Sequence, residues 1–407
     1  MRLTAPRVCA LVLLAAVLKQ IAWILWLPPG AIREEVAQYI AISRAGDRDL
    51  SRSNLVPKDL VSLAQFARGE SGRLPIKTDR DVLRLDEALS GITETIFVRA
   101  DVDAPQPSSY HTLLNYARSR LQTVDIRWRW ILLRLPSTVF LIAAGAFSFV
   151  ALRSGFSHSP ITAVLGASMV VLSPATGFGA ATLGPSALMA ALWAAWAFAI
   201  VRHARSARWA VSWAALIALA LSSVDPQGAA ACAATLVAIV SLRVSPGDLS
   251  SRVARPVAMA FSLLGLGLWT FRFFGSESAG ASPMAWRAWL FSAPSGLGPP
   301  PTCLALGWTA IGAAVLVAFV AAVRLRETQG AFALAVALGL SVAIVRLVPT
   351  PGATALSVAP LAAILGAMGL GRVAATPVRA CTAMACLVVL DWAALLTWAI
   401  PRLYLWH

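Results

Sequence analysis

Long apolar runs alternate with short polar loops along most of the chain. The first run covers residues 8–27, and ten more follow a polar stretch, at about 130–152, 160–177, 185–201, 208–223, 227–243, 256–275, 302–323, 330–348, 353–371 and 380–400. An apolar run of about 20 residues is long enough for a helix to cross the hydrocarbon core of a bilayer. The pattern predicts an all-α polytopic membrane protein with about eleven transmembrane helices.

The polar stretch of about 100 residues after the first run is predicted to form a large helical loop. Ile32, Val36 and Tyr39 recur at helical spacing, and the stretch 110–124 follows the same rule, with Tyr110, Leu113 and Leu114 on its apolar stripe. Such helices beside a bilayer entry point typically lie in the interface. The chain therefore divides into a first transmembrane helix, an extracytoplasmic loop with interfacial helices, and a transmembrane bundle of about ten helices: residues 1–27, 28–129 and 130–407.

The positions of the arginines orient these helices. They occur in every second loop, as Arg153; Arg202, Arg205 and Arg208; Arg243, Arg252 and Arg255; Arg324 and Arg326; and Arg372 and Arg379. Loops rich in Lys and Arg stay in the cytoplasm. We therefore expect a multi-pass protein of the cell (inner or plasma) membrane, with a cytoplasmic N-terminus and the large loop outside.

Composition supports this class and excludes others. The chain has 407 residues, of which 58% are hydrophobic and 13% charged, against about 25% charged in soluble domains. Its net charge is +15, but the excess basic residues are distributed between the apolar segments rather than gathered on one soluble face. No nucleic-acid partner is therefore expected. The five cysteines lie in apolar stretches and the four histidines are scattered, so no metal site is predicted.

Ionisable residues inside the apolar runs are few. Lys19, Arg134 and Arg346 lie near run ends, where a long side chain reaches the interface, whereas Asp391 lies deeper. A transporter needs paired charges in the middle of its helices. A multi-pass transporter is therefore an alternative rather than the favoured function.

Two adjacent carboxylates, Glu34 and Glu35, open the large loop. A carboxylate on an interfacial helix could serve as a general base. Acidic residues also suit the first turn of any helix, because they interact favourably with its dipole. On this motif alone, the structural interpretation is favoured over the catalytic one.

The order of motifs along residues 8–245 resembles the GT-C membrane glycosyltransferases, in particular the branch of aminoarabinose transferases and protein O-mannosyltransferases. In that family the first large loop opens with an acidic pair followed by a tyrosine, here Glu34-Glu35 and Tyr39. The motifs that follow in this chain are Pro105-Gln106-Pro107-Ser108-Ser109-Tyr110, Arg134-Leu135-Pro136-Ser137, Leu172-Ser173-Pro174 and Asp225-Pro226.

The resemblance implies inverting transfer of a sugar from a polyprenyl-phosphate donor to a lipid, glycan or protein acceptor. Glu34 or Glu35 would be the base, and the residues expected at the lipid phosphate are Tyr39, Tyr110, Arg272, Arg287 and Arg346. Each arginine also has an interpretation as an interfacial anchor. The resemblance leaves cofactors undetermined.

Two further residues near these motifs have simpler interpretations. Asp225 is expected to be the N-cap of the sixth span, and His111 a solvated helix residue. Ser108 and Ser109 stand where the family has bulky residues. This departure keeps a third alternative open, a catalytically inactive accessory subunit of the same fold.

Overall fold

The computed structural model describes thirteen segments of the chain and three single residues. They are 5–26, 33–45, 55–57, 97–99, 107–124, 126–155, 160–172, 180–204, 209–225, 227–241, 249–273, 333–341 and 359–373, with residues 379, 382 and 389.

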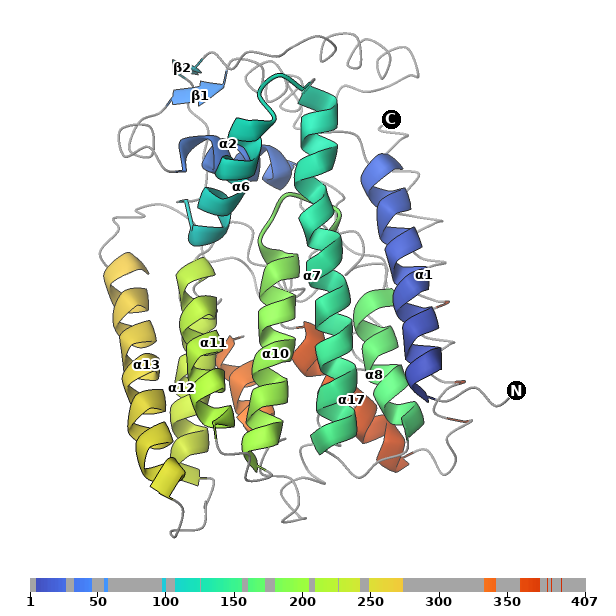
Figure 1. The fold of residues 1–407 in the computed structure, drawn as a ribbon, viewed down its shortest axis with the longest axis vertical. Helices are drawn as coiled ribbons and strands as arrows, with labels where there is room; N and C mark the ends of the chain where they lie inside the picture. The colour runs from blue at the N-terminus through green and yellow to red at the C-terminus, as the bar shows by residue number, and fades with distance from the viewer. Residues whose placement is uncertain are drawn as a thin grey trace.

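Most of the described chain forms a helical bundle (Figure 1). Its helices are α1 (Ala5–Trp26), α7 (Ile126–Gly155), α8 (Pro160–Leu172), α10 (Ser186–Ala204), α11 (Ala210–Val224), α12 (Gly228–Ser241), α13 (Leu249–Phe273) and α17 (Ala359–Val373). Helix α7 packs between α8 and α10, and α11 packs against α10, α12 and α13. Each of these helices falls within or across an apolar run of the sequence, so the periodicity located them correctly.

Three of the helices are long and apolar enough to cross a membrane: Ala5–Leu25, Trp128–Ser154 and Ser186–Ala204. Five shorter apolar helices accompany them in the described residues. The protein is therefore membrane-embedded and predominantly helical. The count of eleven spans remains a prediction, since the run at 302–323 lies outside the described residues and the run at 380–400 is described at residues 382 and 389 alone.

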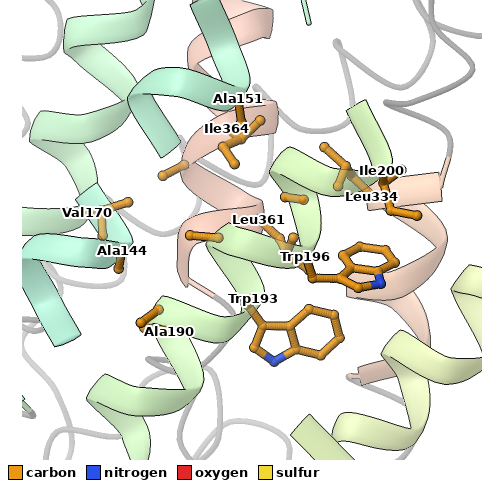
Figure 2. Close-up of a cluster of buried hydrophobic side chains, with 14 of the residues drawn as sticks. Ala144, Ala151, Val170, Ala190, Trp193, Trp196, Ile200, Leu334, Leu361 and Ile364 are labelled. Atoms are coloured by element: carbon orange, nitrogen blue, oxygen red, sulfur yellow. The ribbon is translucent and has the colours of Figure 1, made fainter. Parts of the chain in front are cut away.

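The main core surrounds α10, where Trp193 and Trp196 are completely buried (Figure 2). The Trp196 indole N–H donates to Thr235 Oγ1 of α12 at 2.9 Å. Small residues let the neighbouring backbones approach closely, as at Gly166, where an added Cβ would lie 2.2 Å from Leu152 Cδ1. Such close packing drives helix association in lipid, because burial of apolar surface brings little gain there.

A small cap lies over one end of the bundle (Figure 1). It contains α2 (Arg33–Arg44), α6 (Ser109–Arg120) and a two-stranded antiparallel sheet of β1 (Leu55–Pro57) and β2 (Phe97–Arg99). The two helices agree with the predicted loop helices and pack against each other. The short sheet is an addition to an otherwise helical structure, and it was not predicted because strands of three residues are too short to leave a pattern in the sequence.

Candidate functional site

The acidic motif lies on α2, and Glu35 is its buried member. The Arg134 guanidinium, from α7, donates to both carboxylate oxygens of Glu35, with Nε–Oε1 at 2.7 Å and Nη2–Oε2 at 2.6 Å. Both side chains are completely buried. This is the bidentate arrangement in which arginine and a carboxylate interact most strongly.

Arg134 also connects the cap to the first helix. Its Nη1 donates to the carbonyl oxygen of Ile24 at 3.3 Å, near the end of α1. The sequence predicted that Arg134 would reach the interface from a helix end; instead, it is buried and joins α1, α2 and α7. Removing one partner of a buried ion pair costs roughly 3–5 kcal/mol, because the remaining charge is left without compensation.

The pairing limits what Glu35 can do chemically. A general base must reach the hydroxyl whose proton it removes, and both oxygens of Glu35 already accept charge-assisted hydrogen bonds inside the protein. In this structure Glu35 fixes α2 on the bundle. Glu34 belongs to the same helix, but its side chain lies outside the described residues.

The two tyrosines predicted at the lipid phosphate are core residues of the contact between cap and bundle. Tyr39 stacks on Trp130 with ring centroids 4.6 Å apart and planes 9° apart, and both rings are completely buried. Tyr110 is 2% exposed and belongs to the same apolar cluster. The structure thus brings Tyr39, Tyr110 and Glu35 together at one end of α7.

Tyr110 is buried without a hydrogen bond to its hydroxyl. Burial raises the pKa of the phenol above its usual range, and the nearby Glu35 charge acts in the same direction. The Ser137 hydroxyl is close enough to offset part of this rise in the pKa, although no hydrogen bond of regular geometry joins the two groups. Tyr110 is therefore held neutral.

His111 joins the two cap helices and is 2% exposed, so the expectation of a solvated residue was wrong. The backbone N–H of Ser108 donates to His111 Nδ1 at 2.9 Å. Since this N–H can only donate, Nδ1 is the acceptor and the ring proton is on Nε2. That proton is donated to Gln38 Oε1 of α2, with the heavy atoms 2.6 Å apart. The signal in the sequence was the Ser108–His111 spacing, which is that of a capping box.

Helix α6 is fixed at both ends. At its start, the hydroxyls of Ser109 and Ser223, the latter near the end of α11, are 3.2 Å apart. Beyond its end, Arg129 of α7 donates to the carbonyl oxygens of Leu121, Gln122 and Val124 at 3.0, 2.8 and 2.9 Å. These bonds occupy carbonyls that no longer have helical partners.

Asp225 is the C-cap residue of α11, and its Oδ1 accepts the backbone N–H of Gln227 at 2.8 Å, just before α12 begins at Gly228. This bond closes the turn between the two helices. Asp225 is therefore not the N-cap of the next helix, although its role in this connection is structural.

The structure does not place the remaining predicted residues beside Glu35, Tyr39 and Tyr110. Arg272 belongs to α13, but its side chain lies outside the described residues, as do Arg287, Arg346 and Asp391 entirely. Lys19 donates from Nζ to the carbonyl oxygen of Val171, next to the last residue of α8. Within the described residues, no three His, Cys, Asp or Glu side chains are grouped as metal ligands would be.

Comparison with known proteins finds similarity at the level of structure. No protein-family model and no curated protein matches the sequence. The chain is similar to the oligosaccharyltransferase of Archaeoglobus fulgidus in two crystal structures. For the complex with Zn and sulfate, the identity is 12%, the coverage 74% of this chain and 44% of that one, and the TM-score 0.40. For the apo form, the identity is 11%, the coverage 98% of this chain and 55% of that one, and the TM-score 0.48. The chain spans about half the length of these structures.

Proposed function

We propose that the protein is an integral membrane glycosyltransferase of the GT-C type, which moves a sugar from a polyprenyl-phosphate donor to a lipid, glycan or protein acceptor on the extracytoplasmic face. The observation that carries the proposal is the fixed position of the acidic helix. Ion pairing of Glu35 with Arg134 holds α2 at one end of the bundle, and the Gln38–His111 hydrogen bond holds α2 against α6. The motif order of the first 245 residues supplies the reaction class.

Within this proposal the two carboxylates have different roles. Glu35 is a positioning residue, because its oxygens are committed to Arg134. Glu34 is the general base, at a helical position about 100° around α2 from Glu35. It removes the proton of the acceptor hydroxyl while the acceptor oxygen bonds to the anomeric carbon. The bond from that carbon to the lipid phosphate breaks, and the phosphate leaves with the electron pair.

The departing phosphate needs cations. We assign this role to Arg272, Arg287 and Arg346, since guanidinium groups match phosphate oxygens in pairs. The orientation of the protein follows the same proposal: the N-terminus is cytoplasmic, and the cap faces the extracytoplasmic side of the cell membrane.

A second function is favoured by one observation. Because Arg134 occupies Glu35 completely, the acidic motif serves a structural purpose even without catalysis. A catalytically inactive accessory subunit would need only this structural role of the acidic motif. A transporter is less favoured, because the buried ion pair in the described residues joins a cap helix to the end of α7 rather than two mid-membrane positions.

The test is transfer of labelled sugar from polyprenyl-phosphate donors by purified protein in nanodiscs. Glu34→Gln should lower the rate by roughly 10²–10⁴-fold without changing the unfolding midpoint, the loss typical of a missing general base. Arg120→Gln is the matched control, because Arg120 is an exposed charge of the cap that contacts Tyr116. Full activity of Glu34→Gln rules out this base. A folded wild type that transfers sugar from no such donor favours the accessory subunit.

A further inference from the structure

The end of the bundle away from the cap is strongly basic. Helices α7 and α10 end there, and α11 and α13 begin there (Figure 1). In sequence, the segments 153–159, 202–209 and 242–255 carry seven arginines against one acidic residue, Asp248. Such an excess favours the cytoplasmic side of a membrane, but it does not by itself make a binding site.

His203 adds a buried group that lacks a partner. It lies in the last turn of α10 and is 4% exposed, and its Nε2 has no hydrogen bond. The dipole of α10 favours a basic residue at this position, because the negative end of the helix is here. The dipole gives Nε2 no hydrogen-bond partner, however, and a buried polar atom without one costs free energy. A polar ligand at this end of α10 would supply the missing bond.

Arg255 approaches His203 from another helix. It is half-buried on α13, and it is close enough to His203 for the two groups to interact electrostatically. The adjacent residue, Ala254, accepts a hydrogen bond from Ser212 Oγ of α11 at 3.1 Å, which holds this part of α13 against α11. Two basic side chains from different helices therefore converge at this end of the bundle.

The charge of these two side chains indicates the kind of ligand. The acidic side chains that the structure describes are Glu35 and Asp225, and both lie at the cap end of the bundle. An anion would therefore interact favourably with His203 and Arg255 together, whereas a neutral ligand would gain nothing from their charge. A phosphate group suits them, because its oxygens can accept from a guanidinium and from an imidazole N–H at the same time.

The surroundings indicate a lipid as the source of the phosphate. Trp209, at the start of α11, is half-exposed, as is typical of tryptophans at the level of the headgroups. Val253, Met259 and Leu263 are exposed on α13, so an apolar surface continues along the helix from the level of Arg255. Acyl chains can lie on this surface while the headgroup reaches the basic side chains. A zwitterionic headgroup would bring its own cation next to them, so a net anionic lipid is favoured.

We propose that His203 and Arg255 form a binding site for the phosphate of an anionic phospholipid, in the leaflet away from the cap. In the orientation proposed above this is the cytoplasmic leaflet, whose surface is negatively charged. The bound lipid stabilises the packing of α13 on the bundle, since a ligand that binds the folded state alone raises its stability. The site lies at the opposite end of the bundle from α2, so it does not depend on sugar transfer.

The experiment measures lipid binding to the full chain in detergent by native mass spectrometry. The probes are dioleoyl phosphatidylglycerol and dioleoyl phosphatidylcholine, which have the same acyl chains and differ in net charge. We expect phosphatidylglycerol to bind more tightly. His203→Phe and Arg255→Gln should each weaken its binding roughly tenfold, the value of a hydrogen bond to a charged group, and leave phosphatidylcholine binding unchanged. Without lipid, His203→Phe should keep the unfolding midpoint of the wild type, because the lost Nε2 had no partner.

The matched control is Arg7→Gln. It removes an exposed arginine of α1 at the same end of the bundle, on the far side from α13 (Figure 1), and should leave phosphatidylglycerol affinity unchanged. The proposal is overturned if the two lipids bind alike. It is also overturned if Arg7→Gln weakens binding as much as the site variants do, because general attraction to the basic end would then explain the binding. Inorganic phosphate tests the source: if it raises the unfolding midpoint of the wild type but not of His203→Phe, and the protein shows no lipid preference, the ligand is a soluble anion rather than a lipid.

Discussion

The contact between cap and bundle and the core around α10 are stabilised in different ways. The cap is held on the bundle by the Glu35–Arg134 ion pair, the Ser109–Ser223 contact and one small apolar cluster that includes the stacked Tyr39 and Trp130 rings. The His111–Gln38 bond joins the two cap helices to each other. The core consists mostly of alanines and branched aliphatic residues around two tryptophans, and the Trp196–Thr235 hydrogen bond lies among them. The core is therefore stabilised by many apolar contacts, whereas the contact between cap and bundle combines a smaller apolar cluster with a buried ion pair.

This difference determines how each region responds to change. Loss of one small packing contact weakens the core by a fraction of its total, but loss of one ionic partner removes much of what holds the cap and leaves a buried charge. We therefore expect the cap to open more readily than the bundle unfolds. The following predictions test this contrast, beginning with the largest expected effect.

Arg134→Met should detach the cap. The substitution leaves the Glu35 carboxylate buried and unpaired, at a cost of roughly 3–5 kcal/mol. We expect hydrogen exchange of α2 and α6 to rise by two orders of magnitude or more, while α10 stays protected. Mass spectrometry of peptides from each helix measures the contrast, and equal loss of protection in α10 would contradict it.

The double variant Glu35→Leu/Arg134→Met provides the control. Replacing a buried ion pair by apolar residues of similar volume is often neutral or stabilising. We expect the double variant to recover most of the protection that Arg134→Met loses. If it is no more protected than the single variant, the ion pair is not what holds the cap.

Gln38→Leu should have an intermediate effect, through the contact between the two cap helices. The His111 Nε2–H would lose its acceptor while remaining buried, at a cost of about 1–3 kcal/mol. Protection of α2 and α6 should fall less than in Arg134→Met. His111→Leu combined with Gln38→Leu removes both partners and should restore part of the loss; a further, additive loss would show that no bond couples the pair.

Trp196→Phe should weaken the core by only about 1 kcal/mol, because it removes the bond to Thr235 and part of a buried ring. Thr235 keeps its bond to the carbonyl oxygen of Ala231. The unfolding midpoint of the bundle should fall slightly, and cap protection should not change. A cap that opens in this variant would mean that the two regions are not independent.

The smallest perturbation tests which region faces outward. Ser71→Cys in the large loop and Ser206→Cys after α10, each in a cysteine-free background, should leave stability unchanged. An impermeant thiol reagent should label Ser71→Cys and not Ser206→Cys in intact cells, because arginine-rich loops stay inside. The opposite labelling would reverse the orientation.

The helices were predictable from sequence because apolar periodicity is local. Helices α2 and α6 lie where that pattern placed them, although Leu113, expected on the buried stripe of α6, is 58% exposed, while Leu114 is 2% exposed. Helix α6 buries a narrower face than the pattern suggested. The partner of a buried charge is not local information: Glu35 and Arg134 are 99 residues apart.

One available signal was not used in the prediction. An arginine inside an apolar run requires an anionic or carbonyl partner, and an acidic pair at the start of the neighbouring loop was the candidate nearest the same membrane boundary. The His111–Gln38 bond offers no comparable sign, because its two side chains are neutral and 73 residues apart. The burial of Ser137 and Thr138 on α7 is equally invisible in sequence, since serine and threonine are ordinary in helices of this kind.

The long sequence separation of the ion pair also has a consequence during biosynthesis. Arg134 bonds to Ile24 and Glu35, which precede it by 110 and 99 residues. At a synthesis rate of 5–20 residues per second, about 5–20 s pass between the emergence of Glu35 and that of its partner. During this interval the first helix and the acidic helix exist without α7. Docking of the cap is thus a late step of assembly, and a chain truncated before α7 would expose the acidic helix to quality control.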